Sequence, residues 1–294
     1  MKNKTKESAI GLLIVIPMVI YVLIFLLVPL LMLFYYSFTD YGIAIKEKWI
    51  GLQNFISIFR YPEYLDSFWI TLKLAVLLTA FGMISGFLLS LAINSLKWGK
   101  GTIRVIWYLP GILSMAIVSQ FITMFIAPNG TLNRIIEKLG NEPIVWTQSK
   151  FWMFFIIIAL IIWKGLGGTV LLFLAGLNSI SKDVYEAAEI DGANKLKKLY
   201  YITMPLIKPM FGFILITGFM GAMSVFEPVL LISGGGPDGA TKVILYRIYD
   251  EAFNNYKYGF ACALSLLVAF ATLALTLVNI RFSDNSIFKL EKDM

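Results

Sequence analysis

The fold class is decided by residues 151–177, which read FWMFFIIIALIIWKGLGGTVLLFLAGL. This run contains one charged residue, Lys164, and exceeds the roughly 20 apolar residues that a helix needs to cross the hydrocarbon of a bilayer. The whole chain follows the same trend, since 59% of its residues are hydrophobic, 15% are charged and its mean hydropathy is +0.78. Soluble domains carry about 25% charged residues, so the missing charge indicates a surface that faces lipid.

Five further apolar stretches of similar length flank this one. Together they predict an all-α membrane protein with six transmembrane helices, organised as a single transmembrane domain over residues 1–294. Prolines inside the stretches are compatible with spanning, because neighbouring helices satisfy the freed carbonyls. The predicted spans are residues 9–36, 68–96, 105–127, 151–177, 209–232 and 260–280.

The loops between these stretches differ in charge. Loops on the side of the two termini carry 14 lysines and arginines, against 9 on the opposite side, while the acidic residues number 8 and 9. The positive-inside rule then places the N- and C-termini in the cytoplasm. This asymmetry also accounts for the formal net charge of +7 without nucleic acid, for which the chain offers no dense basic run.

Histidine is absent and Cys262 is the single cysteine. The composition therefore excludes a disulfide within the chain, a His/Cys zinc site and catalysis by a histidine base. No metal or cofactor is expected on this chain, and an enzyme is disfavoured.

Residues 49–59 precede the second span and form an amphipathic pattern, with apolar side chains at three- and four-residue spacing from Trp49 to Phe59. The pattern predicts a short helix that either lies in the outer membrane interface or packs on the helix bundle.

The most informative loop is residues 178–208, between spans four and five. Ser181 is a predicted N-cap with Asp183 in the first turn, and Gly192 fits the left-handed residue that ends a helix. A second short helix is expected from about Asn194, before Pro205 turns the chain toward the next span. The small side chains of Ala187 and Ala188 allow another backbone to approach, either that of a partner or that of the protein's own helices.

Three elements of this loop occur at fixed distances: Glu186-Ala187-Ala188, Asp191-Gly192-Ala193 and Ile202-Thr203-Met204-Pro205. They resemble the EAA loop of binding-protein-dependent ABC permeases, with Met204 in place of the usual leucine. Residues 178–208 are therefore called the EAA loop below. Further segments resemble sugar permeases of the maltose and glycerol-phosphate type, and the resemblance covers nearly the whole chain. These segments are Leu109-Pro110, Asn129–Asn133, Gly234–Thr241 and Tyr249–Phe253.

The resemblance implies the type I ABC importer fold in a bacterial inner or plasma membrane, with the EAA loop in a cleft of an ATPase subunit. It also implies four kinds of partner: a second, homologous permease in a heterodimer, two ABC ATPase domains that use ATP and Mg²⁺, an extracellular or periplasmic solute-binding protein, and a sugar substrate. The chain itself lacks an ATP site of the P-loop type, because Ala240 follows Gly239 where a P-loop has lysine.

Polar residues inside the predicted spans are candidates for the substrate pathway, because buried charge in a membrane is costly. Trp163 and Lys164 could stack on and hydrogen-bond a sugar, or Lys164 could instead pair with a backbone carbonyl or a partner's carboxylate. Gln120 and Glu227 are the other candidates, and Lys73 lies at a depth that would allow an ion pair with Glu227.

The EAA loop favours an ABC import permease. The resemblance to sugar permeases and the aromatic content favour a sugar or oligosaccharide as substrate, with glycerol phosphate or another polyol as an alternative. A second class of function is an ion-coupled secondary transporter that uses Lys73, Lys164 and Glu227. An internal inverted repeat would favour that class, and none is evident.

Overall fold

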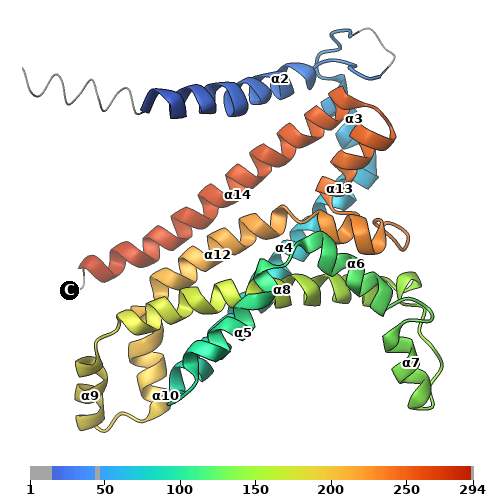
Figure 1. The fold of residues 1–294 in the computed structure, drawn as a ribbon. Helices are drawn as coiled ribbons and strands as arrows, with labels where there is room; N and C mark the ends of the chain where they lie inside the picture. Colours follow the sequence, from blue (N-terminus) through green and yellow to red (C-terminus); the bar gives the residue numbers. More distant parts are fainter. Residues whose placement is uncertain (1–14, 44–46, 293–294) are drawn as a thin grey trace, which may run out of the picture. The chain divides into compact units, whose positions relative to one another are not determined.

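The computed structural model describes residues 15–43 and 47–292 (Figure 1). Helices dominate this part of the chain, and its β-pairing is limited to one antiparallel bridge between Thr39 and Trp49. The all-α class is thus confirmed. Contacts divide the chain into two units, Met1–Leu65 with Arg247–Phe270 and Asp66–Tyr246 with Ala271–Met294. That residues 1–294 act as one transmembrane domain stays a prediction.

The helices up to residue 148 are η1 Leu23–Leu27, α2 Val28–Tyr36, α3 Gln53–Arg60, α4 Pro62–Ser95, α5 Lys100–Ile112, α6 Met115–Phe125, α7 Thr131–Lys138 and η2 Trp146–Gln148. The next are α8 Lys150–Ser179, α9 Lys182–Ile190, α10 Lys195–Lys198, η3 Leu199–Thr203, α11 Met204–Leu206 and α12 Lys208–Met223. The last are η4 Val229–Ser233, α13 Ile244–Tyr249, η5 Asp250–Asn254 and α14 Tyr258–Lys292.

Among the described residues, four single helices are long and apolar enough to cross a membrane. They are Val15–Tyr36, Pro62–Ser95, Lys150–Ser179 and Tyr258–Val278. Two bent helix pairs raise the number to six if each pair is one span: α5 with α6, and Lys195–Leu206 with α12. The predicted number of six equals this upper count, but the bounds of the second pair differ from the predicted fifth span of residues 209–232. The pair begins at Lys195, inside the predicted loop 178–208, and ends at Met223. Residues 9–14 of the first predicted span lie outside the described residues.

The third and fifth predicted spans are interrupted. Helices α5 and α6 meet at 89° around Leu113, which adopts an extended conformation three residues after Pro110. Helix α12 ends at Met223, and helical structure resumes at Glu227. In both places a proline lacks the N–H that the carbonyl four residues earlier would accept, so the hydrogen-bond ladder weakens there.

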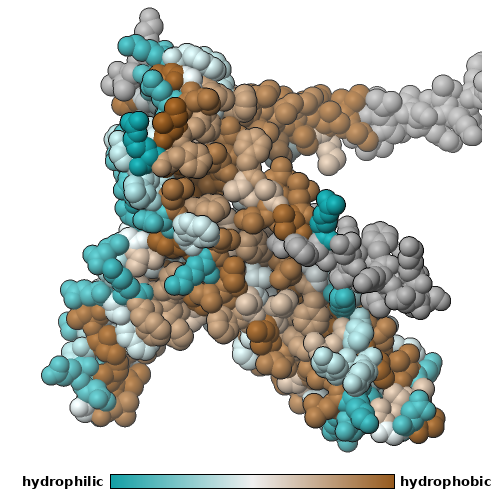
Figure 2. Space-filling view, turned by 180° about the vertical axis from the view of Figure 1, so that it is seen from behind, coloured by the Kyte–Doolittle hydropathy of each residue, from teal (hydrophilic) through white to brown (hydrophobic). Residues whose placement is uncertain are grey.

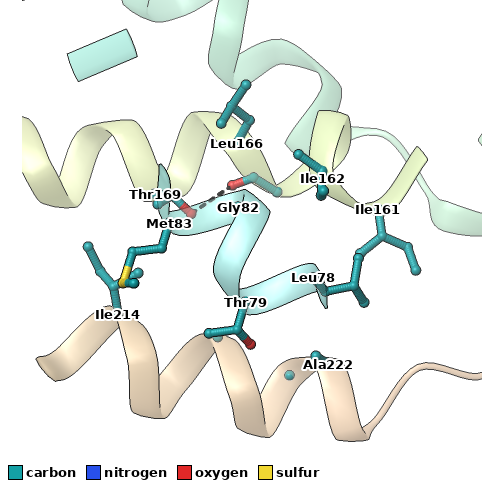
Figure 3. A pocket seen from close by; sticks show the side chains of 13 residues that line it. Leu78, Thr79, Gly82, Met83, Ile161, Ile162, Leu166, Thr169, Ile214 and Ala222 are labelled. Carbon is teal, nitrogen blue, oxygen red and sulfur yellow. Dashed lines mark hydrogen bonds between the residues drawn. The ribbon is translucent and has the colours of Figure 1, made fainter. Parts of the chain in front are cut away.

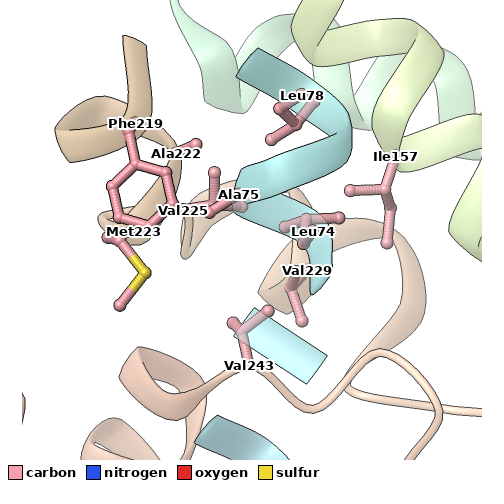
Figure 4. Close-up of a cluster of buried hydrophobic side chains, with 10 residues drawn as sticks. All are labelled: Leu74, Ala75, Leu78, Ile157, Phe219, Ala222, Met223, Val225, Val229 and Val243. Carbon is pink, nitrogen blue, oxygen red and sulfur yellow. The ribbon is translucent and has the colours of Figure 1, made fainter. Parts of the chain in front are cut away.

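The core of the larger unit forms where α4, α8 and α12 meet. One buried cluster joins these helices to η4 and to the segment before α13 (Figure 4). Its members are Leu74, Ala75, Leu78, Ile157, Phe219, Ala222, Met223, Val225, Val229 and Val243. A second cluster contains the rings of Phe87, Phe173 and Phe211, whose centroids lie 4.8–5.3 Å apart. These contacts fix α12, which continues from the EAA loop, against α4 and α8.

Helices α5 and α8 approach each other closely at Gly167. A Cβ atom at this position would lie 2.4 Å from the backbone oxygen of Trp107 and 2.6 Å from the Cα of Tyr108. Only glycine fits such a backbone contact. The close approach brings the end of α5 next to the middle of α8.

In the smaller unit, α3 confirms the short helix predicted within residues 49–59. Its buried side chains are Asn54 and Ile58, and Asn54 Nδ2 donates to the carbonyls of Ser37 and Thr39 at 2.9 and 2.8 Å. The predicted apolar stripe is mostly on the other side, since Ile56 and Phe59 are exposed. Both predicted locations of this stripe, the outer membrane interface and the helix bundle, stay predictions.

Candidate functional site: the EAA loop and the α5–α6 break

The EAA loop is a helical hairpin. Helix α9 begins after Ser181, whose Oγ accepts a hydrogen bond from Asp183 N, and it ends before Gly192, which has φ +75°. Asn194 caps the second helix by accepting from Lys197 N, and that helix continues through η3 and α11 to Leu206. The predicted N-cap at Ser181, the left-handed glycine and the start of a second helix near Asn194 are thus confirmed.

Three interactions hold the two helices of the hairpin together. Tyr185 Oη and Thr203 Oγ1 lie 2.9 Å apart in a hydrogen bond, and the N–H of Ala193 donates to the carbonyl of Ala188. Lys198 forms an ion pair with Glu189. The hairpin is therefore cross-linked along its length.

The hydrogen bond from Lys198 and its charge hold the pKa of the Glu189 carboxyl below its ordinary value. A depressed folded-state pKa means that the ion pair contributes above the unfolded pKa and is lost as pH falls through the folded value. Glu189 is solvent-exposed, and the pair is intact at neutral pH.

The predicted site residues fall into two groups by burial. Glu186, Ala187, Asp191 and Gly192 are exposed, whereas Ala193, Ile202 and Pro205 are half-buried. Ala188 is 9% exposed and packs inside the hairpin, which is the alternative of contact with the protein's own helices, whereas Ala187 stays exposed. The reason is the turn at Gly192, which folds the second helix back over Ala188.

The outward face of α9 contains a residue that the sequence analysis missed. Ile190 is 87% exposed, and it shares a face with Glu186 and Ala187 at three- and four-residue spacing. Ile190 therefore adds an exposed apolar side chain to the candidate coupling face of α9. The helical spacing was the available signal.

Lys164 lies at the break between α5 and α6. Its Nζ donates to the carbonyl of Gly111 at 3.1 Å, near the end of α5, where carbonyls lose their helical partners. The structure thus matches the carbonyl alternative for Lys164. Trp163, its neighbour on α8, is 43% exposed and remains available to another molecule.

The other two pathway candidates are not joined to Lys164 by any contact that the described residues show. Gln120 is an exposed residue on α6, and Glu227 is exposed beside the gap between α12 and η4. Helix α6 packs against η4, with Thr123 Oγ1 donating to Leu231 O at 3.4 Å. The Lys73–Glu227 ion pair does not form in the described chain; Lys73 Nζ instead lies 5.5 Å from the centre of the Phe154 ring.

A cavity of about 220 Å³ lies between α4, α8 and α12 (Figure 3). Its lining is mostly apolar and includes four glycines, Gly82, Gly165, Gly218 and Gly221. Thr79 Oγ1 borders it without a hydrogen-bond partner. None of the predicted pathway residues lines this cavity. It lies among three helices, of which α8 and α12 flank the EAA loop in the sequence.

The Gly234–Thr241 segment is a closed turn. Thr241 Oγ1 donates to Gly236 O at 2.8 Å and lies 2.7 Å from Ser233 Oγ. Asp238 forms an ion pair with Lys150 at 3.3 Å. Among the residues that the structure describes, no cluster of three or more His, Cys, Asp or Glu side chains is arranged to hold a metal ion.

Comparison with known families matches residues 89–286 to the family described as binding-protein-dependent transport system inner membrane component. The trehalose/maltose transport system permease protein MalF of Thermococcus litoralis is 32% identical, over 95% of both chains. The sn-glycerol-3-phosphate transport system permease protein UgpA of Shigella flexneri is 28% identical, over 94% of both.

Among solved structures, a bacterial ABC transporter involved in the import of the acidic polysaccharide alginate contains a similar chain. The TM-score is 0.86 at 27% identity, with 96% of this chain and 98% of the other covered. A second structure, of the alginate ABC transporter in complex with an alginate pentasaccharide-bound periplasmic protein, matches with a TM-score of 0.85 at 26% identity.

Proposed function

The chain belongs to the family of binding-protein-dependent transport system inner membrane components, and from that premise we propose that it forms half of the membrane pathway of an importer for a sugar or oligosaccharide. As a member of this family it is a membrane-spanning permease subunit of an ABC transporter. Its partners in the proposal are a second, homologous permease, two ATPase domains that consume ATP and Mg²⁺, and a solute-binding protein outside the membrane.

The observation that carries the proposal is the shape of the EAA loop. Its helix α9 exposes Glu186, Ala187 and Ile190 on one face, while the turn at Gly192 and the ion pair between Glu189 and Lys198 hold it in one geometry. A short exposed helix that is held in place by contacts with a second helix is suited to bind another subunit.

A force on α9 can be transmitted to the membrane helices both along the chain and through contacts between packed helices. Helix α9 follows α8 after two residues, and its partner helix continues into α12 through a bend of 62°. Helices α8 and α12 border the same cavity with α4, and α8 touches α5 at Gly167. Movement of the hairpin would thus reach α4, α5, α8 and α12, and the gap between three of them leaves room for it.

Two features support a carbohydrate as substrate. The named relatives include a trehalose/maltose permease and a structure of an alginate importer, and Trp163 presents an exposed aromatic face beside the α5–α6 break. Sugar rings stack on such faces. The permease for sn-glycerol 3-phosphate among the relatives keeps glycerol phosphate or a polyol as the second candidate. An ion-coupled secondary transporter is not favoured, because the EAA loop would then have no partner.

Reconstitution tests the proposal. The four-part complex in liposomes, with its solute-binding protein outside, should take up radiolabelled maltose, or another sugar to which the binding protein shows affinity in calorimetry, only when ATP is supplied to the ATPase. Uptake by this chain alone without ATP would overturn the assignment as an ABC permease. Binding of glycerol 3-phosphate but no sugar by the binding protein would replace the proposed substrate.

A further inference from the structure

Charge is divided between the two helices of the EAA loop. The acidic residues of the loop, Asp183, Glu186, Glu189 and Asp191, all precede Gly192. From Gly192 to Phe226 the sequence contains no acidic residue at all, yet it contains Lys195, Lys197, Lys198 and Lys208. Segregation of this kind indicates that the two helices face different surroundings.

The basic helix does not continue the direction of the membrane helix that follows it. Residues Lys195–Leu206 are bent by 62° from α12, and Figure 1 shows them leading away from the end of α12 beside α9. If α12 crosses the bilayer along its normal, this bend tilts the Lys195–Leu206 segment closer to the membrane plane than to the normal. The elbow, defined as residues 195–211, then sits where headgroups meet hydrocarbon.

Side chains at the elbow fit that location. Leu196, Tyr200 and Tyr201 are 76%, 68% and 74% exposed, and tyrosine is enriched at membrane interfaces. Lys198 is engaged by Glu189, whereas the structure gives Lys195 and Lys208 exposed side chains with no acidic partner. In Figure 2 the lower right lobe, which includes this loop, shows hydrophilic residues next to hydrophobic ones.

A surface hollow of about 480 Å³ opens at the bend. It is lined by Tyr200, Met204, Pro205, Lys208 and Phe211. The hollow thus combines two polar groups, the ammonium of Lys208 and the phenol of Tyr200, with three apolar side chains. The apolar side chains are Met204, Pro205 and Phe211. That combination matches a phospholipid, with its phosphate on Lys208 and the upper part of an acyl chain on Met204 and Phe211.

We propose that the elbow is a binding site for an anionic phospholipid such as phosphatidylglycerol, which fixes the base of the EAA loop at the membrane surface. The proposal rests on the proposed crossing of the bilayer by α12 but not on the identity of the transported substrate. The charge division gives each helix its own partner: the acidic α9 faces a protein subunit and the basic helix faces lipid headgroups.

Native mass spectrometry of the purified complex tests the site, with phosphatidylglycerol and phosphatidylcholine titrated in parallel. The wild type should retain phosphatidylglycerol preferentially, and Lys208→Gln should weaken that retention about fivefold, the contribution of one lysine near an anionic surface. The triple variant Lys195→Gln/Lys197→Gln/Lys208→Gln should abolish the preference. Lys182→Gln is the matched control, because it removes one charge from the same loop but on α9, and it should bind like the wild type.

Two results would overturn the proposal. One is equal phosphatidylglycerol retention by the wild type and the triple variant. The other is loss of the ATPase subunit from the triple variant, which would assign the lysines to a subunit contact instead of lipid. ATP-driven uptake is measured in the same preparations to separate this test from that of the proposed function. A wild-type complex that binds the lipid but imports no sugar would refute the proposed substrate and leave the lipid site standing.

Discussion

At the scale of single residues, two adjacent glycines of α8 have opposite environments. A Cβ on Gly167 would lie 2.4 Å from the Trp107 carbonyl oxygen, whereas a Cβ on Gly168 meets no atom within 4 Å. We expect Gly167→Ala to destabilise the protein by about 1–3 kcal/mol, because α5 and α8 must move apart. Gly168→Ala is the control and should be neutral or slightly stabilising. Thermal unfolding in detergent measures both, and equal melting temperatures would contradict the close contact.

Lys164 is the second residue whose role can be tested alone. Lys164→Leu removes the donor to the Gly111 carbonyl, and leaving a carbonyl unsatisfied costs roughly 1–3 kcal/mol when it is shielded from water. We expect that variant to assemble but to import severalfold more slowly, since the α5–α6 break loses its support. Lys164→Arg keeps the donor and should retain most of the transport rate. Normal uptake by Lys164→Leu would show that the hydrogen bond has no part in transport.

Single-residue roles were only partly predictable from the sequence. The carbonyl partner of Lys164 was one of three alternatives, because hydropathy shows that a lysine is costly in a membrane but not which acceptor it finds. Whether Ala188 faces a partner or the protein's own helices was left open, since its position depends on how the turn at Gly192 folds the second helix back. Ile190 could have been found from its spacing to Glu186 and Ala187.

At the scale of elements, the loop between α6 and α8 depends on one asparagine. Asn133 is fully buried; its Nδ2 donates to the carbonyls of Pro128 and Ile144, and its Oδ1 accepts from Ile144 N and Trp146 Nε1. Asn133→Ala should cost about 2–4 kcal/mol locally, because several buried polar groups lose partners together. Hydrogen exchange of residues 127–149 should rise sharply. The exposed Asn141→Ala is the control, and unchanged exchange in Asn133→Ala would show that the loop is held otherwise.

Hydropathy predicted where the helices lie far better than it predicted where a helix is interrupted. Helices α4 and α8 begin and end within a few residues of the predicted spans 68–96 and 151–177. The exception is the start of α4, which lies earlier, at Pro62. The 89° bend between α5 and α6 was not anticipated, because a broken helix and a straight one have the same hydropathy. Pro110 was the signal for it, but prolines are tolerated in spanning helices, so the proline alone does not specify a break.

At the scale of the whole molecule, the family and the EAA loop were predictable because they rest on residue types at fixed spacing. The membrane orientation and the partner subunits stay predictions, since neither lipid nor a second chain constrains the isolated permease. What the fold adds is a mechanical link: the hairpin is continuous with α8 and α12, which border the same cavity as α4. Coupling can therefore be tested by changing the hairpin without touching the membrane helices.

Gly192 provides that test. Its φ of +75° is a backbone conformation that favours glycine, whereas a Cβ there would meet no atom within 4 Å, so a side chain at this position causes backbone strain without a steric clash. Gly192→Val should therefore strain the turn by roughly 1 kcal/mol or more and turn α9 away from its partner. Gly192→Asn introduces a side chain that tolerates the left-handed region and should remain active. We expect Gly192→Val to insert into the membrane and to lose ATP-driven uptake.

A cross-link identifies where coupling fails. Cys262 is the only cysteine, so a Cys262→Ser background leaves no competing thiol. Ala187→Cys is the position of choice, because Ala187 is exposed and Ala188 is buried. Oxidation should join Ala187→Cys to a cysteine in the ATPase cleft, and Gly192→Val should reduce that yield while Gly192→Asn preserves it. Full uptake by Gly192→Val, or an active complex that never cross-links at Ala187→Cys, would mean that α9 does not transmit the motion.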